Sequence, residues 1–125
     1  MATDLSLTMQ AVDDAVRLER WGHAEAQLAA ASPSPTIQIA RARLELARGG
    51  KVDETILGLR ALLTDADLPA MQASLAHELI ATGYVRKRLS AVAREVIADA
   101  EAAHGPTPGL HVVRATSFQT DDDRL

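Results

Sequence analysis

The clearest helical pattern in the chain lies in residues 52–63, which read VDETILGLRALL. Large aliphatic side chains follow one another there at steps of four, three and four, namely Val52, Ile56, Leu59 and Leu63. This spacing places side chains on one face of an α-helix. We therefore predict a helix over residues 53–64 whose aliphatic face, with Leu59 on it, is buried against other helices.

Five further segments carry aliphatic residues at helical spacing. With residues 53–64 they predict about six short helices, over residues 4–20, 23–31, 35–48, 53–64, 68–82 and 85–103. We expect Gly22 and Gly83 to end the first and fifth helices, and the pair Gly49-Gly50 to cap the third in the left-handed conformation. The pair Ser34-Pro35 is a favourable start for the third helix.

The composition favours helices over sheets. Hydrophobic residues make up 47% of the 125 residues but aromatic residues only 2%, so alanine and leucine must provide most of the packing. Strands use β-branched and aromatic side chains, whereas alanine and leucine favour helices. A chain of this length usually forms one core. We expect a single all-α domain over residues 1–103.

Charge and cysteine content disfavour several kinds of partner. The net charge of −4 and the three aromatic rings suit neither a phosphate backbone nor base stacking, so no nucleic-acid partner is expected. Without cysteine the chain forms no disulfide and no thiolate metal site. No signal-peptide pattern and no apolar run of about 20 residues is present. We expect a cytoplasmic protein with no membrane partner.

The C-terminal residues 104–125 differ from the rest of the chain. The segment HGPTPG at residues 104–109 is typical of a break in regular helix. The acidic run Asp121-Asp122-Asp123 is typical of a solvated segment. We predict a linker followed by a non-helical acidic tail, part of which packs on the helices.

Glycines recur between the two helices of each predicted pair. Gly50 follows Gly22 by 28 residues, and Gly83 follows Gly50 by 33. Such a period is typical of helical-repeat proteins, in which each helix pair buries its apolar face on the next pair. Short connections make consecutive helices antiparallel neighbours. We predict three antiparallel helix pairs, stacked in order as a short α-solenoid.

One motif resembles a known repeat family. The string GKVDETI at residues 50–56 is similar to the turn and second-helix start of a tetratricopeptide repeat (TPR), and Leu75, Ala76 and Leu79 resemble its first-helix packing positions. The resemblance implies a TPR-like stack in which the first helix of each pair lines a concave peptide groove. It also implies an adaptor or chaperone-like role. An unrelated six-helix bundle would produce a similar pattern.

A polar row on the predicted third helix is the main candidate for partner binding. The resemblance implies that this helix and the fifth helix line the groove. The candidate contact residues are Gln38, Arg41, Arg43, Glu45, Arg48 and Gln72. The planar guanidinium groups of arginine can donate hydrogen bonds to carboxylates or carbonyl oxygens. A solvated helix face with no binding role explains the row equally well.

A second candidate is the run of three cations Arg86, Lys87 and Arg88, in the first turn of the predicted sixth helix. The positive end of the helix dipole disfavours cations there, which points to a compensating anion. The acidic run at residues 121–123 would supply it if the linker reverses the chain. A solvated helix end is the alternative.

No catalytic, cofactor or metal site is expected. His77 and Glu78 begin a zinc-protease helix motif, but Ala81 stands in place of the second histidine. Ser74 precedes His77 by three residues, without an acid or a glycine-rich elbow to orient a nucleophile. We therefore expect no enzyme activity.

A protein-interaction module is the function that these patterns favour. Stacked helices offer an extended surface for a peptide or a helix of another protein. The alternative is a homo-oligomeric structural protein, in which the sixth helix and the tail pack on a second copy. A small enzyme with a pocket assembled from scattered side chains is a third class.

Overall fold

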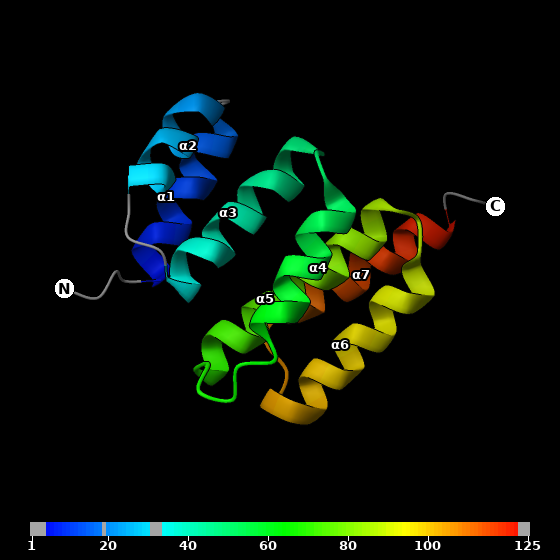
Figure 1. The fold of residues 1–125 in the computed structure, drawn as a ribbon. Coiled ribbons are helices and arrows are strands. Elements are labelled where there is room, and N and C mark those ends of the chain that lie inside the picture. The colour runs from blue at the N-terminus through cyan, green and yellow to red at the C-terminus, as the bar shows by residue number, and fades with distance from the viewer. Residues whose placement is uncertain (1–4, 19, 31–33, 123–125) are drawn as a thin grey trace.

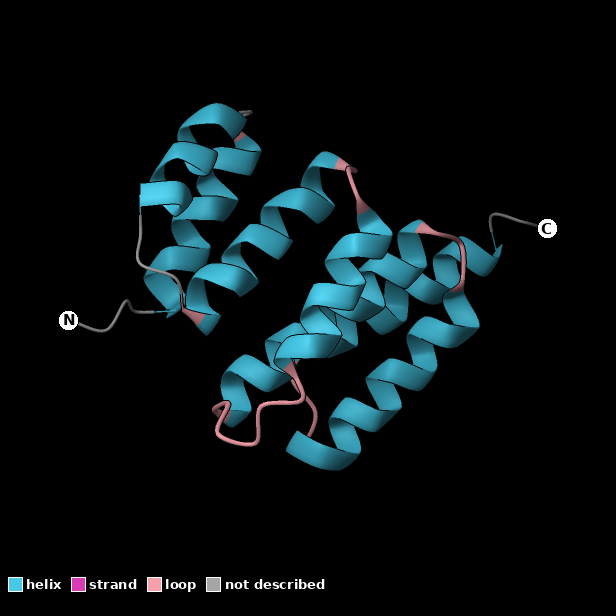
Figure 2. Cartoon of the chain, in the orientation of Figure 1, coloured by secondary structure: helices cyan, strands magenta, loops and turns pink. Residues whose placement is uncertain are grey.

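The computed structural model describes residues 5–18, 20–30 and 34–122, and this part of the chain contains seven helices and no strand (Figure 1, Figure 2). The prediction of an all-α protein is confirmed. None of the described helices is long and apolar enough to cross a lipid bilayer. The helices are α1 (Leu5–Arg17), α2 (Trp21–Ala30), α3 (Pro35–Arg48), α4 (Val52–Leu62), α5 (Ala70–Arg86), α6 (Ser90–His104) and α7 (Pro108–Asp122).

Consecutive helices lie side by side and alternate in direction (Figure 1). Each helix packs against the next one along the chain. The odd-numbered helices also pack against one another in the order α1, α3, α5, α7. Each even-numbered helix therefore bridges two odd-numbered neighbours.

Two hydrophobic clusters hold the helices together. The larger cluster joins α3 to α7 and includes the fully buried Ile39, Leu79 and Leu110. The smaller cluster joins α1, α2 and α3 and includes Val12 and Leu28. Because α3 contributes side chains to both clusters, it links the two ends of the stack.

Local signals define α3 as predicted. Ser34 Oγ accepts a hydrogen bond from the Ile37 amide at 3.2 Å, and Pro35 occupies the first helical position. At the other end, Gly49 adopts a φ of 77°, which favours glycine. The predicted burial of Leu59 is also confirmed, because only 2% of it is exposed and it belongs to the larger cluster.

The prediction that Gly83 ends the fifth helix is wrong, because α5 continues to Arg86. Gly83 is buried within the helix and does not adopt a positive φ. A Cβ at this position would lie 3.0 Å from Ile56 Cδ1 of α4, closer than carbon atoms pack favourably. The glycine therefore allows α4 to approach α5. Because α5 extends to Arg86, the next helix, α6, begins only at Ser90.

The expected break at Gly22 is also misplaced. The first helix ends at Arg17 and the second begins at Trp21, so Gly22 lies in the first turn of α2. Glycine weakens a helix through its backbone conformational freedom, a cost that applies mainly in the helix interior and not at the helix end. Trp21 is half-buried and packs against the smaller cluster.

The prediction of a non-helical tail is wrong, because residues 108–122 form α7. The same proline-rich and glycine-rich segment ends α6 and begins α7. Gly105 follows α6 with a φ of 88°. Thr107 Oγ1 then accepts a hydrogen bond from the Leu110 amide at 3.1 Å, and Pro108 occupies the first helical position, where its missing N–H costs nothing. Leu110 anchors α7 in the larger cluster.

Candidate functional site

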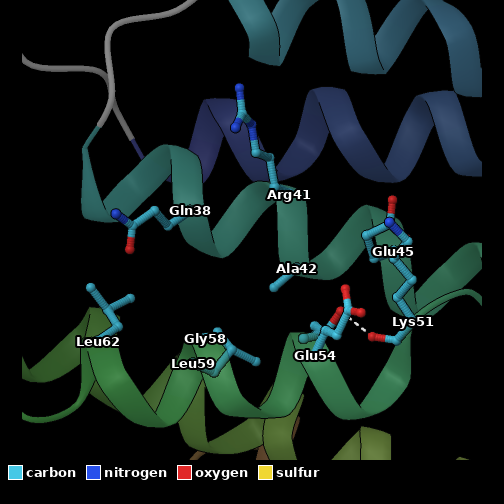
Figure 3. A pocket seen from close by; sticks show the side chains of 10 residues that line it. Gln38, Arg41, Ala42, Glu45, Lys51, Glu54, Gly58, Leu59 and Leu62 are labelled. Carbon is cyan, nitrogen blue, oxygen red and sulfur yellow. Dashed lines mark hydrogen bonds between the residues drawn. The ribbon is translucent and has the colours of Figure 1, made fainter.

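Several surface clefts lie beside α3. The first, the α3–α4 cleft, has a volume of about 510 Å³ (Figure 3). It is lined by Gln38, Arg41, Ala42, Glu45, Lys51, Glu54, Thr55, Gly58, Leu59 and Leu62. The second, the α3–α5–α7 groove, has a volume of about 460 Å³. It is lined by Arg43, Glu78, Thr82, Val85, Arg86, Gly109, Val112, Val113 and Thr116.

The α3–α4 cleft contains three residues of the predicted binding row, namely Gln38, Arg41 and Glu45. In Figure 3, Gln38 and Glu45 lie toward opposite ends of the cleft, and Arg41 points away from α4. Arg41 Nη2 donates a hydrogen bond to the Leu28 carbonyl oxygen of α2 at 3.3 Å. Part of the row therefore serves a contact between helices.

Arg48 and Glu45 are also engaged within the molecule. Arg48 forms an ion pair with Glu25 of α2, and its Nη1 lies 3.7 Å from Glu45 Oε1. The pair with Glu25 joins α3 to α2, and the contact with Glu45 lies within α3. A partner that bound here would have to share or displace them.

Arg43 and Gln72 lie apart from the rest of the row. Arg43 follows Arg41 by two positions, about 200° around the helix, and its Nε donates to Asp13 Oδ1 of α1 at 3.0 Å. Gln72 Nε2 donates to Thr36 Oγ1 at 3.3 Å and joins the starts of α5 and α3. The six predicted contact residues are thus not brought together on one surface.

The α3–α5–α7 groove has a mixed lining, in which three valines lie beside two threonines and three charged side chains. Along α5, the half-buried Glu78, Thr82 and Val85 line the groove at helical spacing. The Thr82 and Thr116 hydroxyls donate to carbonyl oxygens of their own helices at 2.9 and 3.0 Å. Val112 stands on the α7 wall with 61% of its surface exposed.

Glu78 supplies a carboxylate at one end of this groove. The carboxylate lies against the first turn of α7, where a Cβ on Gly109 would overlap it. Burial raises the pKa of Glu78, the Arg43 guanidinium lowers it and Asp13 raises it, and the net shift is upward. No hydrogen bond or ion pair joins this carboxylate to another side chain in the described part of the chain.

The three consecutive cations lie at the end of α5, and their predicted position in the first turn of the next helix is wrong. Arg86 is in the last turn of α5, Lys87 caps the helix, and Arg88 follows with a φ of 63°. The negative end of the helix dipole favours cations here, so the expected electrostatic cost is reversed. Lys87 forms an ion pair with Asp53 of α4. The predicted contact with residues 121–123 lies outside the described side chains.

Of the residues considered for catalysis, His77 lies close to α6, whereas Glu78 lies in the α3–α5–α7 groove. His77 is half-buried, and its ring centroid lies 5.9 Å from that of His104. Burial lowers the pKa of His77, His104 and Arg60 lower it further, and Asp99 raises it. Ser74 is buried. Within residues 5–18, 20–30 and 34–122, no group of three or more histidine, aspartate or glutamate side chains could hold a metal ion.

Several groove residues were not predicted as site residues, in particular Thr82, Val85 and Val112. The spacing of Glu78, Thr82 and Val85 indicates one face of a helix. No local signal shows that α7 forms a wall beside this face, because that wall exists only if residues 108–122 are helical. The groove therefore depends on α7, a helix that was not predicted because the proline-rich segment before it indicates a break in regular helix.

Comparison of the chain with protein-family models, curated protein sequences and solved structures finds no match. The resemblance to TPR proteins stays a prediction that depends on residues 50–56 and on three packing positions in α5. A functional proposal for this chain must therefore start from its own geometry.

Proposed function

We propose that this chain is a protein-interaction module that holds a short segment of a partner protein in the α3–α5–α7 groove. The observation that carries the proposal is a partly exposed aliphatic surface in the groove, where Val112 on one wall is 61% exposed and Val85 on the floor is half-buried. Apolar side chains in a concave surface bind ligands by removing apolar surface from water.

The dimensions of the groove suit a short peptide. Its volume of about 460 Å³ lies within the range of ligand sites, roughly 300–1,000 Å³. Its lining along α5 extends from Glu78 to Arg86, which corresponds to about 12 Å of helix. An extended chain rises about 3.3 Å per residue, so three or four residues of a peptide would occupy this length.

The arrangement of the odd-numbered helices supports the same surface. α3, α5 and α7 run in one direction and provide the walls and floor of the groove (Figure 1). In TPR proteins, the first helices of successive pairs line the peptide groove. On this resemblance, α3, α5 and α7 occupy first-helix positions of a short solenoid.

Self-association through α7 is a second candidate function. Phe118 on this helix is 52% exposed, and the Arg94 guanidinium lies 4.6 Å from its ring centroid. Aromatic and arginine side chains are enriched in protein interfaces. Light scattering over a range of concentrations tests this candidate. A mass that increases with concentration, and that Phe118→Ser returns to the monomer value, would favour it.

A peptide selection tests binding in the groove. A random heptapeptide library displayed on phage is selected against the full chain, and enriched peptides are measured by fluorescence anisotropy. Val112→Asn places a neutral polar amide on the groove wall and should weaken binding by about tenfold. The matched control is Leu57→Asn, because Leu57 is 67% exposed on α4 outside the groove. Equal effects of the two substitutions would contradict the proposed function.

A further inference from the structure

The Glu78 end of the α3–α5–α7 groove carries one negative charge in excess. Arg43 Nε donates to Asp13 Oδ1 at 3.0 Å, so this guanidinium already has a carboxylate partner. Glu78 interacts electrostatically with Arg43 and Asp13. Its carboxylate forms no ion pair or hydrogen bond with any described side chain. Two carboxylates therefore share one cation.

Packing holds Glu78 in this position. Its carboxylate fits against α7 only because residue 109 is glycine, since a Cβ there would overlap it. The side chain is half-buried and lines the groove. Removing a carboxylate from water without a partner is costly, and burial accordingly raises the pKa of Glu78. A ligand that brings a cation would remove this cost.

We infer that the groove selects a partner segment in which a lysine or arginine stands next to an aliphatic residue. The cation pairs with the Glu78 carboxylate, and the aliphatic side chain packs on Val85 and Val112. This inference rests on the proposed function and adds to it the chemistry of the partner. The aliphatic stem of a lysine or arginine would cover Thr82 while its charged end reaches Glu78.

The remaining charges favour a single cation at this end. Arg86 lies about 12 Å further along α5 and would repel a second cation placed there. An acidic side chain near Glu78 would instead meet the like charges of Glu78 and Asp13. The chain as a whole carries a net charge of −4, which increases the encounter rate with basic segments.

Peptide selection against two forms of the full chain tests the inference. The random heptapeptide library is selected against the parent and against Glu78→Gln, which removes the charge and keeps the shape. Peptides with a basic residue beside an aliphatic one should be enriched by the parent and not by Glu78→Gln. Glu54→Gln is the matched control, because it removes a carboxylate of α4 that lies outside the groove, and it should select the same peptides as the parent.

Affinity measurements give the second readout. For the most enriched basic peptide, replacement of its cation by glutamine should weaken binding to the parent about five- to tenfold. The same replacement should change binding to Glu78→Gln by less than about twofold. Glu78→Asp keeps the charge and should retain the preference for the basic peptide. This variant provides a second test if circular dichroism shows that Glu78→Gln is unfolded.

The outcomes separate this inference from the proposed function. Enriched peptides that Val112→Asn no longer binds, but that carry no basic residue, would overturn the inference and leave the groove as a binding site. An equal loss on cation replacement in the parent and in Glu78→Gln would have the same consequence. No enrichment, or enriched peptides that bind Val112→Asn as well as the parent, would overturn both.

Discussion

Replacement of Gly83 by alanine tests how α4 packs on α5. A new Cβ would lie 3.0 Å from both Cδ1 and Cγ1 of Ile56, and 3.4 Å from Cγ1 of Val52. Carbon atoms pack favourably at about 3.5–4.0 Å, so α4 must move or Ile56 must change its rotamer. A Cβ at Gly58 in α4 would meet no other described helix within 4 Å, which makes Gly58→Ala the matched control.

Two opposing effects set the magnitude. Alanine is about 1 kcal/mol more favourable than glycine in a helix interior, and both substitutions gain this amount. An extra methyl group in a packed core costs about 1–3 kcal/mol, and only Gly83→Ala incurs this cost. We therefore expect Gly58→Ala to raise the free energy of unfolding by about 0.5–1 kcal/mol. Gly83→Ala should lower it by up to about 2 kcal/mol.

Urea unfolding followed by far-ultraviolet circular dichroism measures both effects. The midpoint reports the stability, and an unchanged slope indicates that the surface exposed on unfolding is unchanged. If Gly83→Ala stabilises the protein as much as Gly58→Ala does, α4 does not lie against Gly83. The interpretation of this glycine as a contact residue would then be refuted.

Three further predictions concern the core and two titratable side chains. Leu59→Ala should lower the free energy of unfolding by about 2–5 kcal/mol, because Leu59 is 2% exposed in the larger cluster; an unchanged urea midpoint would contradict this. Because burial raises the pKa of Glu78, its carboxyl contributes stability in acid that is lost as the pH rises through the folded-state pKa. Glu78→Gln should therefore be at least as stable as the parent near neutral pH and lose any advantage in acid, which urea midpoints at the two conditions measure. Burial lowers the pKa of His77, so its contribution to stability is present above about pH 6.5 and is lost as the pH falls through the folded-state pKa. His77→Gln should lose less stability than the parent between about pH 7 and pH 5. If the stability of the two proteins falls in parallel over this range, the His77 ring is not buried.

The boundaries of α3 could be predicted because its signals act over a few residues. Ser34 caps the helix through its own side chain, Pro35 has the φ that a first helical position requires, and Gly49 adopts the left-handed conformation at the end. Each of these effects depends on neighbouring backbone atoms alone. Such signals need no knowledge of the tertiary structure.

Gly83 and Gly105 show why a glycine alone does not define a helix boundary. Gly105 has a positive φ and ends α6, whereas Gly83 lies inside α5 and makes room for Ile56. The residue type is the same, and only the contact with a distant helix distinguishes the two roles. A sequence pattern alone does not contain that contact.

The candidate site could be predicted only in part for the same reason. Periodicity places Arg41 and Arg43 on one helix, but their two-residue separation directs them to different surfaces, where Arg41 bonds to α2 and Arg43 to α1. The sequence pattern predicts a non-helical tail around Val112. Its exposure in a groove arises only after α7 packs on α5.

If a partner segment occupies the α3–α5–α7 groove, mapping of backbone amide shifts by NMR will locate it there. The isotope-labelled full chain is titrated with the most enriched peptide. We predict that the largest shift changes fall on Thr82, Val85 and Val112 and on their neighbours in the groove. Largest changes around Gln38 and Gly58, in the α3–α4 cleft, would contradict the proposed function.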